Sequence, residues 1–203
     1  MAVIIALTAF TWTTSFLRSN TLFQPVSFNQ FFWLLSIYFV IRLIKTQNPI
    51  NWIYIFTIWG IAFLNKYSIA FIIISTLLAI LLTSYRTLFR SKYFFLGGAL
   101  SIIIILPNLF WQYTHNWPVI HHMTELQKNQ LVNVKISSFL LDQLTMNLPA
   151  LIVWISGLIG LFFIKPLKKY RAIAYIYFFT ILIIILLKGK SYYTLGLYSS
   201  LFA

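Results

Sequence analysis

The chain has 203 residues, of which 61% are hydrophobic and only 8% are charged, and its mean hydropathy is +0.87. Soluble domains are about half apolar and a quarter charged, so this composition excludes an ordinary soluble domain. The net charge of +13 comes from 15 basic residues against two acids. Because the basic residues lie mostly in short gaps between apolar runs, they indicate membrane topology and lipid contact, and no nucleic acid partner is expected.

Seven apolar runs follow one another along the chain, and each is predicted to enter the hydrocarbon core of a membrane. They cover residues 1–17, 28–44, 50–64, 68–84, 93–112, 148–164 and 172–187, and an eighth begins near Leu195. Backbone polar groups cannot remain unpaired in hydrocarbon, so each run should be a helix. The sequence therefore predicts an all-α, polytopic membrane helix bundle with about seven transmembrane helices and a partial eighth.

Both ends of the sequence are apolar. Met1 leads directly into an apolar run without the basic stretch of a signal peptide, and residues 195–203 end without a polar tail. Two spans appear interrupted where a bilayer needs them whole. We therefore expect the chain to be a fragment of a longer protein.

The basic residues divide into two sets that occupy alternate gaps between the runs. The larger set comprises Arg42, Lys45, Arg86, Arg90, Lys92, Lys165, Lys168, Lys169 and Arg171. The smaller set comprises Arg18, Lys66, Lys128, Lys135, Lys188 and Lys190. Because cytoplasmic loops carry an excess of Lys and Arg, the larger set is predicted to be cytoplasmic and the smaller set extracytoplasmic.

One long polar segment, residues 112–148, is predicted to form the extracytoplasmic loop of a single membrane module covering residues 1–203. It contains all the histidines and acids of the chain, namely His115, His121, His122, Glu125 and Asp142. Pro118 is suited to begin a helix. On such a helix His121 and His122 lie four and three residues before Glu125, so the three side chains share a face.

Two interpretations of this segment are open. The His–Glu group is able to bind a divalent metal or a phosphate-bearing substrate. Alternatively, Glu125 pairs with Lys128, and the histidines lie at a wet interface. No complete ligand set such as His-Glu-x-x-His is present, so no metal site is assigned. A substrate-facing surface is favoured, because Trp111, Tyr113 and Trp117 frame the segment, although aromatic residues suit membrane interfaces as well as sugar stacking.

Three stretches resemble one family of membrane enzymes. They are Trp59-Gly-Ile-Ala-Phe-Leu-Asn-Lys-Tyr-Ser68, Leu106-Pro-Asn-Leu-Phe-Trp-Gln-Tyr-Thr-His-Asn-Trp-Pro118 and Lys188-Gly-Lys-Ser-Tyr-Tyr-Thr-Leu-Gly-Leu-Tyr198. In this order they are similar to segments of glycosyltransferase family 39-like proteins, which include bacterial relatives of the protein O-mannosyltransferases and of the lipid A aminoarabinose transferase.

The resemblance implies a GT-C fold with its active site on the outer face of a bacterial plasma membrane. It also implies an inverting transfer of a sugar from a polyprenyl-phosphate donor to a lipid or protein acceptor. In such proteins an acidic residue of the first outer loop aids the transfer, often with a divalent metal.

The resemblance also assigns residues to the substrate-binding site. Lys66, followed by Tyr67, matches the family lysine that meets the carrier phosphate, and Lys188, Lys190, Tyr192 and Tyr193 match the later stretch. With the loop residues, the predicted substrate-binding set is Lys66, Tyr67, His115, His121, His122, Glu125, Lys188, Lys190, Tyr192 and Tyr193. Cations in a poorly solvated site stabilise a phosphate leaving group more strongly than cations in water do.

Two departures from the family pattern leave the catalytic residue unassigned. The acid-bearing first outer loop is expected upstream of Met1. In addition, Asn29 stands where the family often has Asp. Asn accepts a hydrogen bond but provides neither a carboxylate base nor charge for a metal, so Asn29 keeps a positioning role or this member is weakened. The fragment alone is expected to be inactive, and metal dependence of the complete protein stays open.

Two other functions are open as alternatives. A transporter or flippase needs ionisable or helix-breaking groups near the membrane midplane, and Pro107 and the Gly97–Gly98 pair are candidates. The runs carry almost no charge, however, and the polar residues gather at one predicted face. A noncatalytic membrane subunit is the third alternative.

Overall fold

The structure is a computed structural model that describes residues 1–202, and within this range the chain forms helices and no strand. The α-helices are α1 (Ala2–Trp12), α2 (Thr14–Thr21), α3 (Pro25–Thr46), α4 (Asn51–Asn65), α5 (Ile69–Leu81), α6 (Lys92–Thr114), α7 (Pro118–Asn129), α8 (Ile136–Met146), α9 (Leu151–Phe163), α10 (Arg171–Leu186) and α11 (Leu195–Tyr198). Short 3-10 segments are η1 (Ser84–Arg90), η2 (Leu131–Asn133), η3 (Leu148–Ala150), η4 (Lys165–Tyr170), η5 (Ser191–Thr194) and η6 (Ser199–Leu201). The predicted all-α class is confirmed.

The first predicted span is wrong in one respect, because residues 1–17 do not form a single helix. The backbone of Thr13 is extended, with φ −74° and ψ 107°, and it divides α1 from α2. The Thr13 hydroxyl donates to the Ala9 carbonyl at 2.7 Å, which places this side chain against the end of α1. The residues of α2 are mainly polar, so α2 does not extend the apolar run.

Fewer helices than predicted are long enough to cross a membrane alone. Three segments are long and apolar enough, namely α3, α6 and residues 165–186, and up to five are counted if each bent helix pair forms one span. The bent pairs are α5 with η1, at 112°, and α8 with residues 148–163, at 66°. The apolar helices α1 and α4 have 11 and 15 residues, whereas a span needs about 20. The bundle is confirmed, but length and composition support three to five spans instead of seven.

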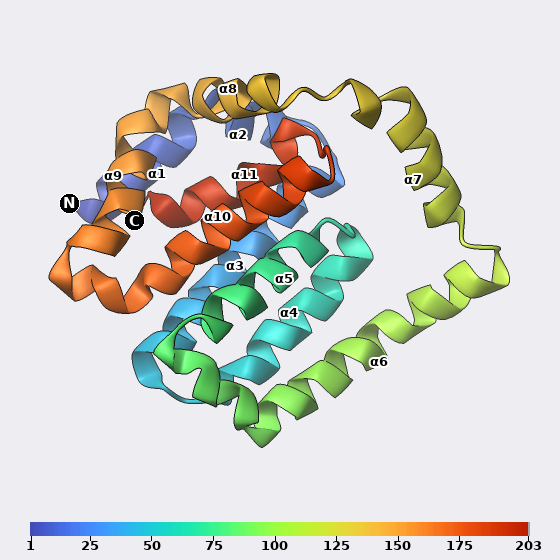
Figure 1. Ribbon diagram of the computed structural model, residues 1–203, viewed down its shortest axis with the longest axis horizontal. Coiled ribbons are helices and arrows are strands. Elements are labelled where there is room, and N and C mark those ends of the chain that lie inside the picture. Colours follow the sequence, from blue (N-terminus) through green and yellow to red (C-terminus); the bar gives the residue numbers. More distant parts are fainter. Residues whose placement is uncertain (203) are drawn as a thin grey trace.

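The centre of the bundle is built on α4, which packs against both α3 and α6, while α5 packs against α10 (Figure 1). Trp33, Trp52 and Trp59 are fully buried in this core. Gly97 permits the close approach of α6 to α4, because a Cβ atom there would lie 2.8 Å from Phe56 Cδ2 and 2.9 Å from the Trp52 carbonyl oxygen. Small residues at such crossings are typical of membrane helix packing.

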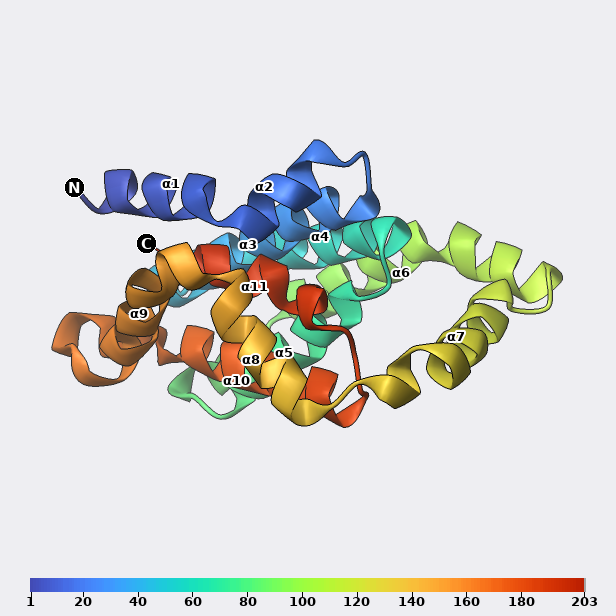
Figure 2. The same cartoon turned by 90° about the horizontal axis from the view of Figure 1, so that it is seen from above.

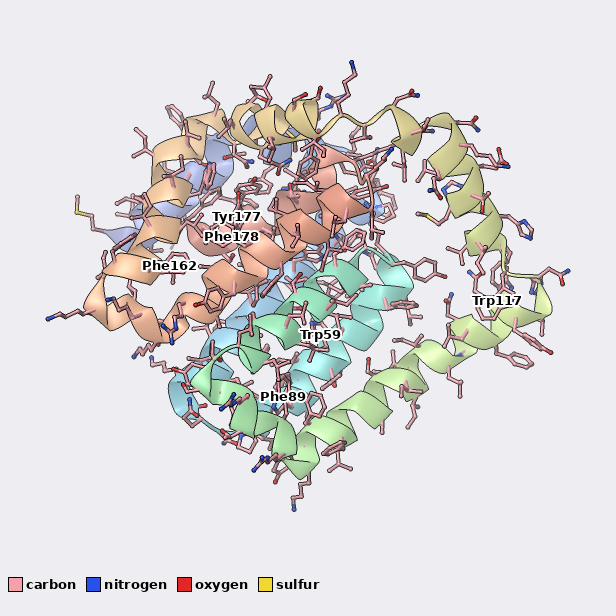
Figure 3. The ribbon with its side chains drawn as sticks, in the orientation of Figure 1. Trp59, Phe89, Trp117, Phe162, Tyr177 and Phe178 are labelled. Carbon is pink, nitrogen blue, oxygen red and sulfur yellow. The ribbon has the colours of Figure 1, made fainter. Side chains whose placement is uncertain are left out.

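Helices α6 and α7 run along the edge of the molecule (Figures 1 and 2). The outward side of α6 exposes large apolar side chains, among them Phe95, Ile102, Ile103 and Phe110. An exposed apolar face of this size suits contact with lipid. In Figure 3, Trp59 lies inside the bundle, whereas Trp117 lies at the tip where α6 passes into α7.

The predicted eighth span corresponds to α11, which has four residues and is followed by η6. It is buried, and a Cβ atom at Gly196 would lie 2.7 Å from Trp33 Cβ, so this glycine lets α11 pack directly on α3.

Two groups of connections lie at different ends of the bundle (Figure 1). At one end, the turn between α4 and α5 lies beside the segment that follows α10. At the other end, Lys168, Lys169 and Arg171 line a cavity together with residues 83–85. Lys66 and Lys190 at the first end belong to the smaller predicted charge set, and Lys168, Lys169 and Arg171 at the second end belong to the larger one. Which end faces the cytoplasm stays a prediction from the charge count.

Candidate functional site

The turn between α4 and α5 carries Lys66 and is tied to the beginning of α3. Lys66 has an extended backbone, with φ −160° and ψ 123°, and ends α4. On one side of it the Asn65 side-chain amide donates to the Pro25 carbonyl at 3.0 Å. On the other side the Ser68 hydroxyl donates to Asn29 Oδ1 at 3.5 Å. Asn29 is buried, so it has the geometry of a residue that positions this turn.

The side chain of Lys66 lies against two aromatic rings from the far end of the chain. Its Nζ atom is 5.2 Å from the ring centroid of Tyr192 and 5.1 Å from that of Tyr193. The two rings are nearly perpendicular to each other, with centroids 4.8 Å apart. Both distances fall within the range of cation–π interactions. We call Lys66, Lys190, Tyr192 and Tyr193 the lysine–tyrosine site.

The Lys66 ammonium is a partly buried positive charge with no carboxylate partner among residues 1–202. Burial lowers the pKa of the Lys66 ammonium, and the nearby positive charge of Lys190 lowers this pKa further. Among residues 1–202 the only ion pair joins Lys128 to Glu125, so Lys66 has no carboxylate partner there. A half-buried charge without a counterion favours an anionic ligand, because the ligand would offset the cost of desolvation.

The segment that carries the two tyrosines is bound to α8 by hydrogen bonds. The Ser191 hydroxyl donates to Asp142 Oδ2 at 2.5 Å. Further along, the Thr194 hydroxyl and the Tyr198 hydroxyl both donate to Gln143 Oε1, at 2.6 and 2.8 Å. Two adjacent residues of α8, Asp142 and Gln143, thus bind this segment.

The preceding residues complete the turn after α10. Lys188 has a left-handed backbone with φ 51°, which ends α10 and reverses the chain. The Lys190 ammonium donates to Gln130 Oε1. Lys190 therefore connects the turn to the region between α7 and α8.

Three cavities adjoin the tyrosines. The largest is mainly apolar, has a volume of about 870 Å³, and lies between α7 and the end of α10. Tyr193 and Lys188 line it together with Phe71, Met123, Thr124, Gln127, Lys128, Leu131, Val132, Leu186, Leu187 and Gly189. A second cavity, of about 400 Å³, is lined by Asp142, Lys190 and Tyr192, and a third, of about 450 Å³, by Arg18 and Tyr192. The two adjacent tyrosines therefore line different spaces.

Tyr67 has a hydrogen-bonding role of its own. Its hydroxyl donates to Asn108 Oδ1 and accepts from Gln112 Nε2, both at 2.9 Å. Gln112 Oε1 in turn accepts from the backbone N–H of Val119 at 3.2 Å. Tyr67 thus connects the Lys66 turn to α6 and to the beginning of α7.

The histidines and Glu125 lie elsewhere. His115 stacks on Trp111, with ring centroids 4.4 Å apart, and its Nδ1 lies 2.8 Å from the Trp111 carbonyl oxygen. Helix α7 begins at Pro118, as predicted, and ends at Asn129. His121, His122 and Glu125 are exposed on it, and they do not line the apolar cavity that adjoins Tyr193.

The predicted alternative partner of Glu125 is present. Glu125 Oε1 lies 4.0 Å from Lys128 Nζ, and Oε2 accepts from the Asn129 amide at 3.3 Å. Residues 1–202 contain no group of three His, Cys, Asp or Glu side chains that could hold a metal ion.

Of the predicted substrate-binding residues, four are brought together from two distant stretches to form the lysine–tyrosine site. Lys188 and Tyr67 lie at its margins, whereas no described contact joins the histidines or Glu125 to it. Sequence reasoning did not select Asp142 and Arg18, which line cavities beside Tyr192. The signal for Asp142 was present, because it is one of only two acids in the chain.

A family model described as dolichyl-phosphate-mannose-protein mannosyltransferase matches residues 1–111, which include Asn29 and Lys66. No curated protein and no solved structure matches the chain significantly.

Proposed function

Because the chain belongs to the dolichyl-phosphate-mannose-protein mannosyltransferase family of GT-C membrane glycosyltransferases, we propose that its donor is a polyprenyl-phosphate sugar. The acceptor is a lipid or a protein, and transfer takes place on the extracytoplasmic face of a bacterial plasma membrane. The larger charge set then lies in the cytoplasm and the lysine–tyrosine site lies outside.

The observation that carries the proposal is the half-buried ammonium of Lys66, which lies beside Lys190 and has no carboxylate partner among residues 1–202. A phosphate group supplies the missing negative charge. When the sugar leaves, the phosphate oxygen gains charge, and two cations in a poorly solvated site stabilise that charge most where it develops. The same two lysines therefore bind the donor and promote departure of the phosphate.

The apolar cavity next to Tyr193 supports a lipid-linked donor. Its lining is mainly aliphatic and aromatic, and Leu186, Leu187 and Met123 are also exposed at the surface of the bundle. Burial of an isoprenoid chain there gains from the hydrophobic effect, at about 25 cal/mol per Å². A phosphate held at Lys66 places the start of such a chain beside this cavity.

The reaction proceeds with inversion. An acceptor heteroatom attacks the anomeric carbon of the sugar and forms the new bond, and its proton passes to the carboxylate that the family resemblance places in the first outer loop. The bond between that carbon and the phosphate oxygen breaks, and its electron pair goes to the phosphate, beside Lys66 and Lys190. The family allows for a divalent metal, but the described residues do not fit one, and these steps use the lysines of the chain itself.

A transfer assay with the protein made from its complete gene tests the proposal. Membranes are given a radiolabelled polyprenyl-phosphate sugar or the matching nucleotide sugar. We expect label to enter the acceptor only from the lipid donor, with a loss of about 10- to 100-fold for Lys66→Met, since charge-assisted contacts contribute about 1.5–3 kcal/mol.

Lys169→Met is the matched control, because Lys169 lies over the Tyr170 ring at 4.9 Å at the other end of the bundle. Normal transfer by well-folded Lys66→Met protein would remove the role of Lys66. Movement of the labelled donor across vesicles without formation of a glycosidic bond would replace the enzyme with a flippase.

A further inference from the structure

The lysine–tyrosine site depends on how one short segment is held. Residues 188–190 follow α10, Tyr192 and Tyr193 lie in the four-residue 3-10 segment η5 (Ser191–Thr194), and α11 begins at Leu195. Neither Tyr192 nor Tyr193 lies in the interior of a long helix, so neighbouring side chains must set where the two rings lie.

Asp142 is the residue best placed to do this. Its carboxylate accepts the hydroxyl proton of Ser191, the residue directly before Tyr192, at 2.5 Å. Hydrogen bonds to ionised acceptors are short and about twice as strong as neutral ones. The remaining acid, Glu125, is two-thirds exposed and lies on α7. Asp142 is therefore the acid that the fold associates with the lysine–tyrosine site.

We propose that Asp142 is a positioning residue of the glycosyltransferase site: its bond to Ser191 fixes the segment that holds Tyr192 and Tyr193 against Lys66. The inference rests on the proposed function wherever sugar transfer is the quantity measured. Asp142 acts through Ser191 and is not assigned to the reacting atoms.

The neighbouring hydrogen bonds should limit the effect of an Asp142 substitution to the lysine–tyrosine site. The Thr194 and Tyr198 hydroxyls donate to Gln143 and not to Asp142, so α11 should keep its attachment to α8 when Asp142 is changed. Lys190 keeps its bond to Gln130. Loss of the Asp142 acceptor therefore removes the side-chain contact of Ser191, while the Ser191 carbonyl still accepts from the Thr194 hydroxyl at 2.8 Å and both flanks have contacts of their own.

Four variants of the protein made from its complete gene separate positioning from direct action. Asp142→Asn keeps an oxygen acceptor for Ser191 and should retain transfer within about threefold of the unmodified protein. Asp142→Ala and Ser191→Ala should each lose about tenfold. The double variant should lose no more than either single one, because both changes break the same contact. Ser137→Ala, at an exposed position of α8, is the control and should keep full transfer.

A covalent replacement provides a rescue test. The chain contains no cysteine, so Asp142→Cys together with Ser191→Cys introduces one unique pair here. Any other cysteine of the complete protein is first replaced. The pair variant should be weak when reduced and should regain transfer when the two thiols are joined by oxidation or by a short bridging reagent. A purely structural role for Asp142 predicts no such recovery, because folding is complete before the bridge is made.

Amine labelling of Lys66, followed by mass spectrometry, provides a readout that does not depend on activity. Release of the tyrosines should increase labelling of Lys66 several-fold in Asp142→Ala and leave it unchanged in Asp142→Asn. If the unmodified protein transfers no sugar from the lipid donor, the proposed function fails, while this labelling still tests the positioning role.

Two results would overturn the inference. One is loss of transfer in Asp142→Asn as large as in Asp142→Ala, with Ser191→Ala fully active, because the carboxylate would then act directly. The other is unchanged transfer and unchanged Lys66 labelling in Asp142→Ala.

Discussion

The ammonium of Lys66 and the ring of Tyr193 lie 5.1 Å apart, although one residue ends α4 and the other follows α10. This contact closes the bundle at one end and leaves a cation covered by aromatic rings. It also places the cation next to a cavity that Tyr193 lines. These three relationships support the proposed binding site for a lipid-linked anion.

The ring of Tyr193, and not its hydroxyl, should matter for this contact. Tyr193→Phe keeps the aromatic face beside Lys66 and should leave donor affinity within about twofold, whereas Tyr193→Leu removes the face. Cation–π contacts contribute about 0.5–2 kcal/mol, so Tyr193→Leu should weaken donor affinity about 2- to 30-fold. Equilibrium binding of labelled donor in detergent provides the measurement. Equal losses in both variants would assign the effect to the hydroxyl instead.

Donor binding should depend on pH through Lys66. Burial and the charge of Lys190 lower the pKa of Lys66 below its ordinary value of 10.5, so the ammonium loses its proton at a lower pH than an exposed lysine does. A phosphodiester donor keeps its single negative charge in this range, and its affinity should fall as pH rises through the lowered pKa. Lys66→Arg keeps its charge and should retain affinity across the same window.

The lowered pKa of Lys66 also affects the free energy of unfolding, which should change with pH in the opposite direction to donor affinity. Between the lowered pKa of the folded protein and 10.5, the unfolded chain binds more protons at Lys66 than the folded chain does. The free energy of unfolding contributed by this residue therefore rises with pH through that window. Binding isotherms and melting curves of the unmodified protein and of Lys66→Arg provide the test. Parallel pH profiles for the two proteins would contradict the assignment.

Tyr67 should contribute to stability through its hydroxyl. Tyr67→Phe leaves the side chains of Asn108 and Gln112 without their shared partner, which costs about 1–3 kcal/mol. The melting temperature should fall by several degrees, and the connection between α6 and α7 should become more sensitive to protease. Tyr113→Phe, at an exposed position, is the control. Equal melting temperatures for both variants would show that the hydrogen bonds contribute nothing.

Gly97 and Gly98 provide a matched pair that tests the packing of α4 on α6. A Cβ atom at Gly97 meets Phe56 Cδ2 at 2.8 Å and backbone at 2.9 Å, whereas at Gly98 the nearest atoms lie at 3.9 Å. Gly97→Ala should therefore destabilise the protein by about 1–3 kcal/mol through overpacking. Gly98→Ala should be neutral or stabilising by up to about 1 kcal/mol, since Ala favours helix. Thermal unfolding in detergent measures both, and equal effects would contradict the close approach seen here.

Much of this architecture could be predicted because apolar length and helix formation are properties of local sequence. Each predicted run is mostly helical in the structure, although Thr13 divides the first, and Pro118 begins α7 as its position indicated. The break at Thr13 was not predicted, because an apolar run indicates burial in lipid but does not determine the local backbone geometry. The lengths of α1 and α4 likewise depend on where the chain turns, which hydropathy alone does not locate.

The candidate site could be predicted in part. Lys66, Lys190, Tyr192 and Tyr193 were assigned to one site by their resemblance to a family, and the structure brings them together. The partnership of Asp142 with Ser191 was not accessible, because hydrogen bonds between distant segments depend on tertiary packing. The histidines of α7 were predicted to bind substrate because of their side-chain chemistry. The sequence does not show which face of that helix adjoins the cavity.

Direct binding of a polyprenyl-phosphate sugar to purified protein tests the central claim most directly. The unmodified protein, Lys66→Met, Lys66→Arg and Lys169→Met are compared in detergent with one labelled donor. Lys66→Met should bind about 10- to 100-fold more weakly at neutral pH, while Lys66→Arg stays within a few-fold and Lys169→Met binds normally. If folded Lys66→Met protein binds the donor as tightly as the unmodified protein does, Lys66 is not the phosphate-binding residue and the account is wrong.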